Sequence, residues 1–106
     1  MKRLLTNNLG FPRIGRQREL KRATESYWKG DIGKDKLLKT AADIRKENWM
    51  LQAEAGIDFV PSNDFSFYDQ VLDTAAMVGA VPERFGWDGG EVGLGLYFRM
   101  ARGAQE

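Results

Sequence analysis

Apolar residues recur at helical spacing over residues 17–29 and 36–56, which predicts two amphipathic helices. Gly30 follows the first stretch and Gly56 is the last residue of the second, and both are expected to end the helices, because glycine readily adopts the left-handed conformation of a C-cap. The longer stretch has the clearest pattern in the chain. Its apolar positions are Leu37, Leu38, Ala41, Ala42, Ile44, Trp49, Leu51 and Ala55.

A third helical pattern covers residues 68–79, and Ser66 and Asp69 precede it at the spacing of a capping box. Residues 85–95 then contain five glycines, which is too many for an ordered core element. Because this segment has no GK[ST] sequence, we interpret it as a flexible link and not as a phosphate loop. The apolar run at residues 96–100 predicts the start of a fourth helix.

Two short runs, residues 4–9 and 57–60, have the composition of buried strands, and Pro61 ends the second one. With helices between them, these runs suggest a βαβ-like order and a parallel sheet. The sequence therefore predicts an α/β fold with two short parallel strands and three to four helices.

The junction between the first loop and the first helix is strongly basic. Five cations and one anion lie within residues 13–22, so this segment carries a net charge of +4 in a chain whose net charge is +1. A helix N-terminus presents unpaired N–H groups and a partial positive charge. Arginines around it favour a site for a carboxylate or a phosphate.

The composition narrows the chemistry that this chain can perform. Its 106 residues have the length of one small domain, and its near-neutral charge argues against a general nucleic-acid binder. The absence of Cys and His excludes disulfides, thiol nucleophiles and imidazole or thiolate metal ligands. The start of the chain has no apolar run long enough for a signal peptide or a membrane span, so we expect a cytoplasmic location.

Each candidate residue also has a structural interpretation. The basic segment can be a solvated helix face with weak ion pairs. The aromatic residues Tyr27, Trp28 and Trp49 can stack on a flat ligand, but at helical spacing they are typical of a core. The aspartates at positions 58, 64 and 69 could act as an acid and base set, although their spacing favours a strand end, a turn and a helix cap.

Several motifs together resemble one known family. They are LGFPRIG at residues 9–15, RELK at 18–21, ESYW at 25–28, AGIDFVPSNDFSFYD at 55–69 and FRMARG at 98–103. In this order they look like the N-terminus of the cobalamin-independent methionine synthases, and the resemblance covers nearly the whole chain.

The resemblance implies a large cytoplasmic methyltransferase of two (βα)8 barrels that makes methionine. It would transfer a methyl group from 5-methyltetrahydropteroyltri-L-glutamate to L-homocysteine. Residues 1–106 would be the N-terminal portion of the first, folate-side barrel, which would be incomplete here, and the catalytic C-terminal barrel would be absent. In that family zinc is held by the C-terminal barrel, so no cofactor or catalytic residue is expected in this chain, which alone should be inactive.

The resemblance also implies a substrate-binding segment, because the family's RELK residues contact the folate. These residues correspond to Arg18, Glu19, Leu20 and Lys21. A triglutamate tail is a flexible polyanion that an arginine can bind through paired hydrogen bonds. Glu19 cannot attract carboxylates, so we expect it to orient Arg18, Arg22 or a backbone donor.

Two function classes remain open from the sequence. One is a part of the methyltransferase that binds the folate tail, and the other is a free-standing anion-binding or interaction module without catalytic activity. An isolated chain with an open sheet edge and uncovered helix faces, such as those of Leu37 and Ile44 or Val71 and Val78, is expected to self-associate. It could do so by edge pairing or by exchange of residues 96–106, with residues 85–95 as the hinge.

Overall fold

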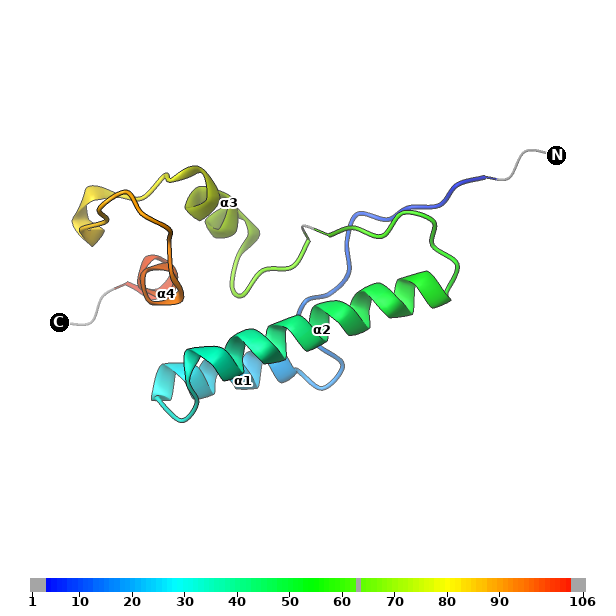
Figure 1. The fold of residues 1–106 in the computed structure, drawn as a ribbon, viewed down its shortest axis with the longest axis horizontal. Helices are drawn as coiled ribbons and strands as arrows, with labels where there is room; N and C mark the ends of the chain where they lie inside the picture. Colours follow the sequence, from blue (N-terminus) through cyan, green and yellow to red (C-terminus); the bar gives the residue numbers. More distant parts are fainter. Residues whose placement is uncertain (1–3, 63, 104–106) are drawn as a thin grey trace. The chain divides into compact units, whose positions relative to one another are not determined.

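The computed structural model describes residues 4–62 and 64–103 and divides into two compact units, Met1–Phe67 and Tyr68–Glu106 (Figure 1). The helices of the first unit are α1 (Glu19–Lys29) and α2 (Lys34–Glu54). Those of the second unit are α3 (Gln70–Val78), the 3-10 helix η1 (Glu83–Phe85) and α4 (Leu94–Arg102).

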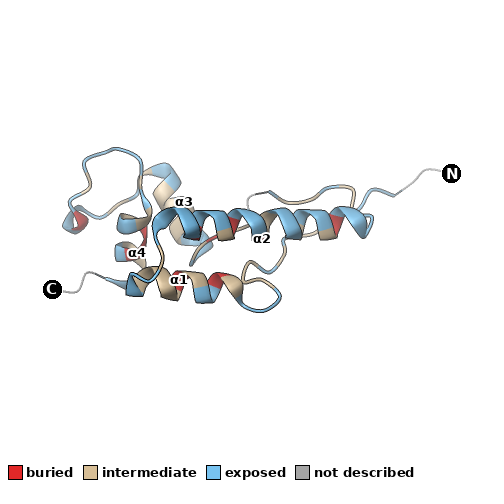
Figure 2. Ribbon diagram, turned by 60° about the horizontal axis from the view of Figure 1, so that its bottom comes forward, coloured by how far each residue is buried: buried red, intermediate tan, exposed pale blue. Residues whose placement is uncertain are grey.

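The core of the first unit lies between α1 and α2, which run side by side in Figures 1 and 2. Leu20 of α1 is fully buried against Ala41 and Ile44 of α2. Burial of a leucine side chain contributes about 1.5–3 kcal/mol, so this contact is a main source of stability for the pair. Residues outside the helices also pack on this cluster. They are Ile14, Phe65 and Phe67.

The ends of α1 and α2 agree with the sequence pattern. Gly30 caps α1 in the left-handed conformation, with a φ of 82°, and its N–H donates to the carbonyl of Tyr27. The connection to α2 is therefore short, and α2 begins at Lys34 and ends at Glu54, close to its predicted range. The two long helical predictions are confirmed because each helix has a buried stripe and a glycine after it.

The predicted α/β fold is wrong. Among the described residues there is no strand, and residues 4–9 and 57–60 are joined only by an isolated parallel bridge between Asn7 and Phe59. The Phe59 N–H donates to the carbonyl of Thr6 at 3.0 Å. The leucines expected to bury the first run are exposed, Leu9 completely, so no packed face extends the pairing into a ladder.

The second unit is organised around the hydroxyl of Tyr97 in α4. This hydroxyl donates to Asp73 Oδ1 at 2.5 Å and accepts from the N–H groups of Tyr68 at 3.0 Å and Asp69 at 3.4 Å. It therefore ties α4 to the start of α3. Burial first, and the hydrogen bond to Asp73 second, raise the pKa of Tyr97 above its ordinary value of 10.

The start of α3 corrects one detail of the sequence analysis. Asp69 is the N-cap, and its Oδ1 accepts from the Val71 N–H at 2.7 Å. Ser66 is buried and lies in the first unit, so it is not the capping residue of a capping box. Gly79 ends α3 as predicted, with a φ of 77°.

The exposure of the apolar helix faces differs between α2 and α3. Leu37 and Ile44 of α2 are buried, so the expectation that they are uncovered is wrong. Val71 and Val78 of α3 are 78% and 67% exposed, as expected. The core interpretation also fails for Trp49, whose side chain is 39% exposed.

The glycine-rich segment forms defined turns between η1 and α4. The indole N–H of Trp87 donates to the Gly90 carbonyl at 2.9 Å, and the Gly90 N–H donates to Asp88 Oδ1 at 3.1 Å. A fourth helix follows as predicted, but it begins already at Leu94. None of the helices in the described residues is long and apolar enough to cross a membrane.

The raised pKa of Tyr97 predicts an alkaline limit to the stability of the second unit. Because the folded state keeps this proton longer than the unfolded chain, the stabilisation is complete below pH 10 and is lost as the pH rises through the higher folded-state pKa. Tyr97→Phe should lower the free energy of unfolding by about 1–3 kcal/mol at pH 7 and weaken its fall above pH 10. Urea unfolding between pH 7 and 11.5 measures both effects.

Tyr68→Phe is the matched control because it leaves the Tyr97 hydroxyl in place. It should keep the alkaline fall of the unmodified chain. If Tyr97→Phe and the unmodified chain lose stability equally above pH 10, the buried hydroxyl is not responsible.

Candidate functional site

The loop that leads into α1 is fixed by polar side chains from distant parts of the chain. Asn8 Nδ2 donates to Gln52 Oε1 at 2.7 Å, and Gln52 is buried within α2. The Phe11 N–H donates to Asp64 Oδ2 at 2.7 Å, and Asn48 Nδ2 donates to the Pro12 carbonyl at 3.3 Å. The loop is therefore held against α2 before the basic residues begin.

The turn before α1 requires a glycine. Gly15 has a φ of 90°, and a Cβ at this position would collide with Glu19 Oε2. The other carboxylate oxygen of Glu19 accepts from the Gln17 N–H at 3.1 Å. Glu19 Oε2 is itself buried without a hydrogen-bond partner in the described part of the chain. Of the three contacts expected for Glu19, the structure has the one to a backbone donor.

Arg18 adopts an unusual backbone conformation at the N-cap of α1. Its φ is 59°, and it is the one residue other than glycine with a positive φ among residues 4–62 and 64–103. This conformation costs a non-glycine residue about 1 kcal/mol or more. The Arg18 side chain is exposed and has no partner within the described residues.

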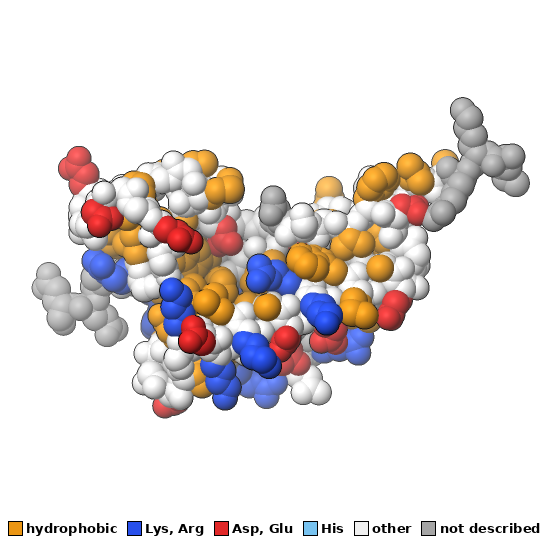
Figure 3. Space-filling model, in the orientation of Figure 1, with side chains coloured by type: hydrophobic (Ala, Val, Ile, Leu, Met, Phe, Trp, Pro, Cys, Tyr) orange, Lys and Arg blue, Asp and Glu red, His pale blue; other side chains and the backbone are white. Residues whose placement is uncertain are grey.

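The other four cations of the segment already have contacts. Figure 3 shows that cationic and anionic side chains alternate on the surface of the first unit. Arg13 points inward, where its guanidinium donates to the Phe67 carbonyl at 3.0 Å. Arg22 donates to the Gln17 carbonyl at 2.7 Å. Arg16 pairs with Glu47 at 3.5 Å and Lys21 pairs with Glu25 at 3.7 Å. The side chains of these two ion pairs are 45–68% exposed. Exposed pairs are worth about 0–1 kcal/mol, so a ligand can compete for Arg16 and Lys21.

The helix N-terminus is less open and less positive than the sequence suggests. The N–H of Leu20 donates to the Ile14 carbonyl at 3.0 Å, and Arg18 makes no side-chain cap. The Glu19 carboxylate lies in the first turn and reduces the local positive charge. Any anion would therefore be bound mainly by exposed guanidinium and ammonium groups.

The structure separates the four residues of the predicted substrate-binding segment by direction. Arg18 and Lys21 are exposed, Glu19 folds back onto the turn at Gly15, and Leu20 is fully buried. Leu20 thus supports the segment from the core side. Gln52, which positions the loop, was missed, although it lies eight residues after Ile44 and so on the buried side of α2.

Each of the three aspartates accepts a hydrogen bond from a backbone N–H group. Asp58 accepts from the Thr6 N–H at 2.8 Å, Asp64 from the Phe11 N–H, and Asp69 caps α3 in the other unit. The helix cap expected at Asp69 is confirmed, whereas the strand end expected at Asp58 is not, because residues 4–62 and 64–103 contain no strand. No group of three or more Asp or Glu residues in the described ranges is placed to hold a metal ion.

The family model described as the cobalamin-independent synthase N-terminal domain matches residues 5–106. The chain belongs to this family. A relative from Salinibacter ruber named 5-methyltetrahydropteroyltriglutamate–homocysteine methyltransferase is 66% identical over 100 residues, which are 94% of this chain and 13% of the relative.

Plant members of the family are also similar to this chain. An Oryza sativa protein named 5-methyltetrahydropteroyltriglutamate–homocysteine methyltransferase 1 is 58% identical over 95 residues, which are 90% of this chain and 12% of the relative. An Arabidopsis thaliana protein with the same enzyme name, numbered 3 and called chloroplastic, is 57% identical with the same coverage. The chain thus spans about one eighth of the length of these curated relatives.

The contact between Gly15 and Glu19 can be tested against a matched glycine. Gly30 has a similar φ of 82°, but a Cβ there would meet nothing within 4 Å. Gly30→Ala should therefore cost about 1–2 kcal/mol of unfolding free energy through its backbone alone. Gly15→Ala should cost up to about 1 kcal/mol more, because the end of the Glu19 side chain must move and give up its hydrogen bond from the Gln17 N–H. Thermal or urea unfolding measures the difference.

The second change Glu19→Ala should relieve the collision. Gly15→Ala combined with Glu19→Ala is expected to lose less stability than the sum of the two single changes. Strict additivity would show that the carboxylate does not pack on Gly15.

Proposed function

We propose that this chain is the N-terminal part of a methyltransferase that makes methionine from L-homocysteine and 5-methyltetrahydropteroyltri-L-glutamate. The observation that carries the proposal is the family match over residues 5–106, together with 66% identity to a relative that bears this enzyme name. Because the chain spans about one eighth of its relatives, the complete reaction is assigned to the longer protein. The 106-residue chain alone is expected to be inactive.

We infer that residues 1–106 belong to the folate-side domain and that the catalytic domain lies in the remainder of the longer protein. The implied zinc does not fit this chain, since it has neither His nor Cys and no suitable carboxylate cluster in its described part. Zinc is accordingly assigned to the catalytic domain. A cytoplasmic location stays a prediction, and the chloroplastic relative indicates that location varies within the family.

The role assigned to the basic junction is recruitment of the glutamate tail. Arg18 supports this role because its guanidinium is exposed and has no partner in the described part of the chain. Lys21 can exchange its exposed ion pair with Glu25 for a ligand carboxylate. A guanidinium binds a carboxylate through two parallel hydrogen bonds, and each added glutamate supplies another carboxylate. Glu19 and Leu20 contribute indirectly, by fixing the turn and the helix that carry Arg18 and Lys21.

The alternative is a free-standing anion-binding or interaction module. It is favoured only by the local basic charge, which would attract any small polyanion. The two functions differ in what they recognise, because a module without folate chemistry should not distinguish a pteroyl tail from an unrelated chain of equal charge.

Binding of folates with one, two and three glutamates to the 106-residue chain tests the proposal. Affinity should be weak, should rise with glutamate number and should fall with added salt, because exposed charges are screened over about 8–10 Å at ordinary ionic strength. Changing Arg18 and Lys21 together to Ala should remove most of the dependence on tail length. Calorimetry or a fluorescence titration measures these affinities.

The control changes Lys36 and Lys39 to Ala, which removes the same charge from an exposed part of α2. It should keep the dependence on tail length. Equal affinity for one and three glutamates, or equal losses in both double variants, would contradict the assignment of the tail to Arg18 and Lys21. Triglutamate without the pteroyl group distinguishes the two functions, because the alternative module should bind it as tightly as it binds the folate.

Self-association of the isolated chain is also proposed, through exposed apolar side chains on α3. The expected pairing of sheet edges has no basis, because the described residues contain an isolated bridge and no sheet. The expected exchange of residues 96–106 includes residues 104–106, which lie outside the described part. Val71 and Val78 are exposed, and their burial between two copies would remove apolar surface from water. Changing both to Ser should reduce the associated fraction in sedimentation velocity, whereas Thr74→Ser on the same helix should not. A monomer at every concentration would contradict this.

A further inference from the structure

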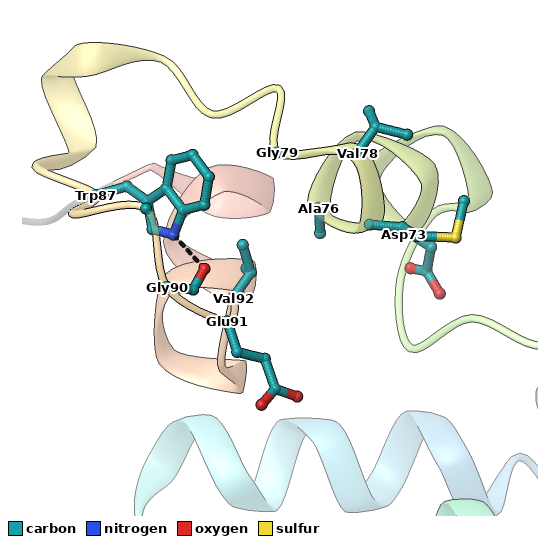
Figure 4. Close-up of a pocket in the computed structure, with 10 residues that line it drawn as sticks. Asp73, Ala76, Val78, Gly79, Trp87, Gly90, Glu91 and Val92 are labelled. Atoms are coloured by element: carbon teal, nitrogen blue, oxygen red, sulfur yellow. Dashed lines mark hydrogen bonds between the residues drawn. The ribbon is translucent and has the colours of Figure 1, made fainter.

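The second unit contains an open cavity of about 520 Å³ that the folate proposal does not use. It lies between α3 and the glycine-rich turns after η1 (Figure 4). In Figure 4, Ala76 and Val78 come from α3 on one side of the gap, and Trp87 and Val92 lie on the other. This volume is in the range of small-molecule sites.

The indole of Trp87 is held in a fixed position at the cavity. Its N–H donates to the Gly90 carbonyl at 2.9 Å. Its far edge lies against Gly79, where a Cβ would be only 3.0 Å from Cη2. The indole therefore presents a fixed aromatic wall whose one polar atom is already engaged.

The charge of the cavity has a single sign. Asp73 and Glu91 line it, and none of the ten lining residues, all of them described, is basic. The hydrogen bond from Tyr97 to Asp73 Oδ1 fixes the Asp73 carboxylate. Figure 4 shows the Asp73 carboxylate on the α3 side of the gap and the Glu91 carboxylate on the side of the glycine-rich turns, below Val92. Two carboxylates beside an apolar wall are too few oxygen ligands for a calcium site, so the lining does not favour a metal ion.

We propose that this cavity binds a guanidinium group carried on a short apolar stem. A guanidinium stacks on an aromatic face and donates paired hydrogen bonds to carboxylates, so Trp87, Asp73 and Glu91 match its chemistry. Ala76 and Val92 would cover the stem. An arginine side chain of a protein partner and a free alkylguanidine share this chemistry.

The probe pair is propylguanidinium and its neutral counterpart propylurea, each titrated into the 106-residue chain. The readout is the NMR resonance of the Trp87 indole N–H, assigned by its loss in Trp87→Phe. Propylguanidinium should shift this resonance in a saturable way, with a dissociation constant of roughly millimolar order, and propylurea should bind at least about tenfold more weakly. Equal binding of the two probes would overturn the proposal.

Single charge changes locate the site. Glu91→Gln should weaken propylguanidinium binding by roughly fivefold, whereas Glu83→Gln, an equal charge change on η1 outside the cavity lining, should not. Asp73→Asn should also weaken binding. Because this change disturbs the hydrogen bond from Tyr97, the folding of the variant is checked by circular dichroism. If the Asp73→Asn variant is unfolded, the result for Glu91→Gln alone decides the assignment. Unchanged affinity in Glu91→Gln would overturn the assignment.

The source of the guanidinium is separated by two acetylated, amidated tripeptides, Ala-Arg-Ala and Ala-citrulline-Ala. Tighter binding of the arginine peptide than of propylguanidinium supports a protein partner. Binding of propylguanidinium with exclusion of the peptide supports a free small cation. In both cases the citrulline peptide should not bind. If the citrulline peptide binds as tightly as the arginine peptide, the cavity does not recognise the positive charge.

Discussion

The first unit depends on the burial of Leu20 between α1 and α2. This contact sets the position of α1, and α1 in turn sets the direction of the residues before and after Leu20. Leu20 faces the core, so Arg18 and Lys21, which lie close to it along the chain, face solvent. The basic surface is therefore a consequence of packing: a helix that buries one leucine completely must turn its neighbouring cations outward.

The helices could be predicted because their signals are local. Gly30 and Gly79 end their helices in the left-handed conformation, and Asp69 caps α3 with its own side chain. Strands carry no such local signal, since a strand is stable only when neighbours bury its faces and complete its hydrogen bonds. Asn7 and Phe59 pair as the parallel arrangement requires, but the pairing extends no further in the described residues. Composition alone cannot reveal that missing support.

For the candidate site, the sequence indicated where cations gather but not which of them has a partner. Arg13 is directed to a carbonyl more than fifty residues away, and Arg16 to Glu47 on α2. These contacts depend on tertiary structure, so only the folded chain distinguishes Arg18 from the other four cations. The turn at Gly15 illustrates the same limit, because the collision partner of a Cβ there is a side chain, Glu19, whose rotamer the sequence does not specify.

The contact between Thr6 and Asp58 has a consequence for the order of folding. The Thr6 N–H donates to Asp58 Oδ2 at 2.8 Å and the Asp58 N–H to Thr6 Oγ1 at 3.0 Å, across a sequence separation of 52 residues. Closing so long a loop costs conformational entropy before any contact is gained. The pair of α1 and α2, with its short connection, lies entirely within this loop and shortens the distance between its ends. We therefore expect the helical hairpin of α1 and α2 to form first. The hydrogen bonds between Thr6 and Asp58 then form later in folding and join the segments on either side of the hairpin.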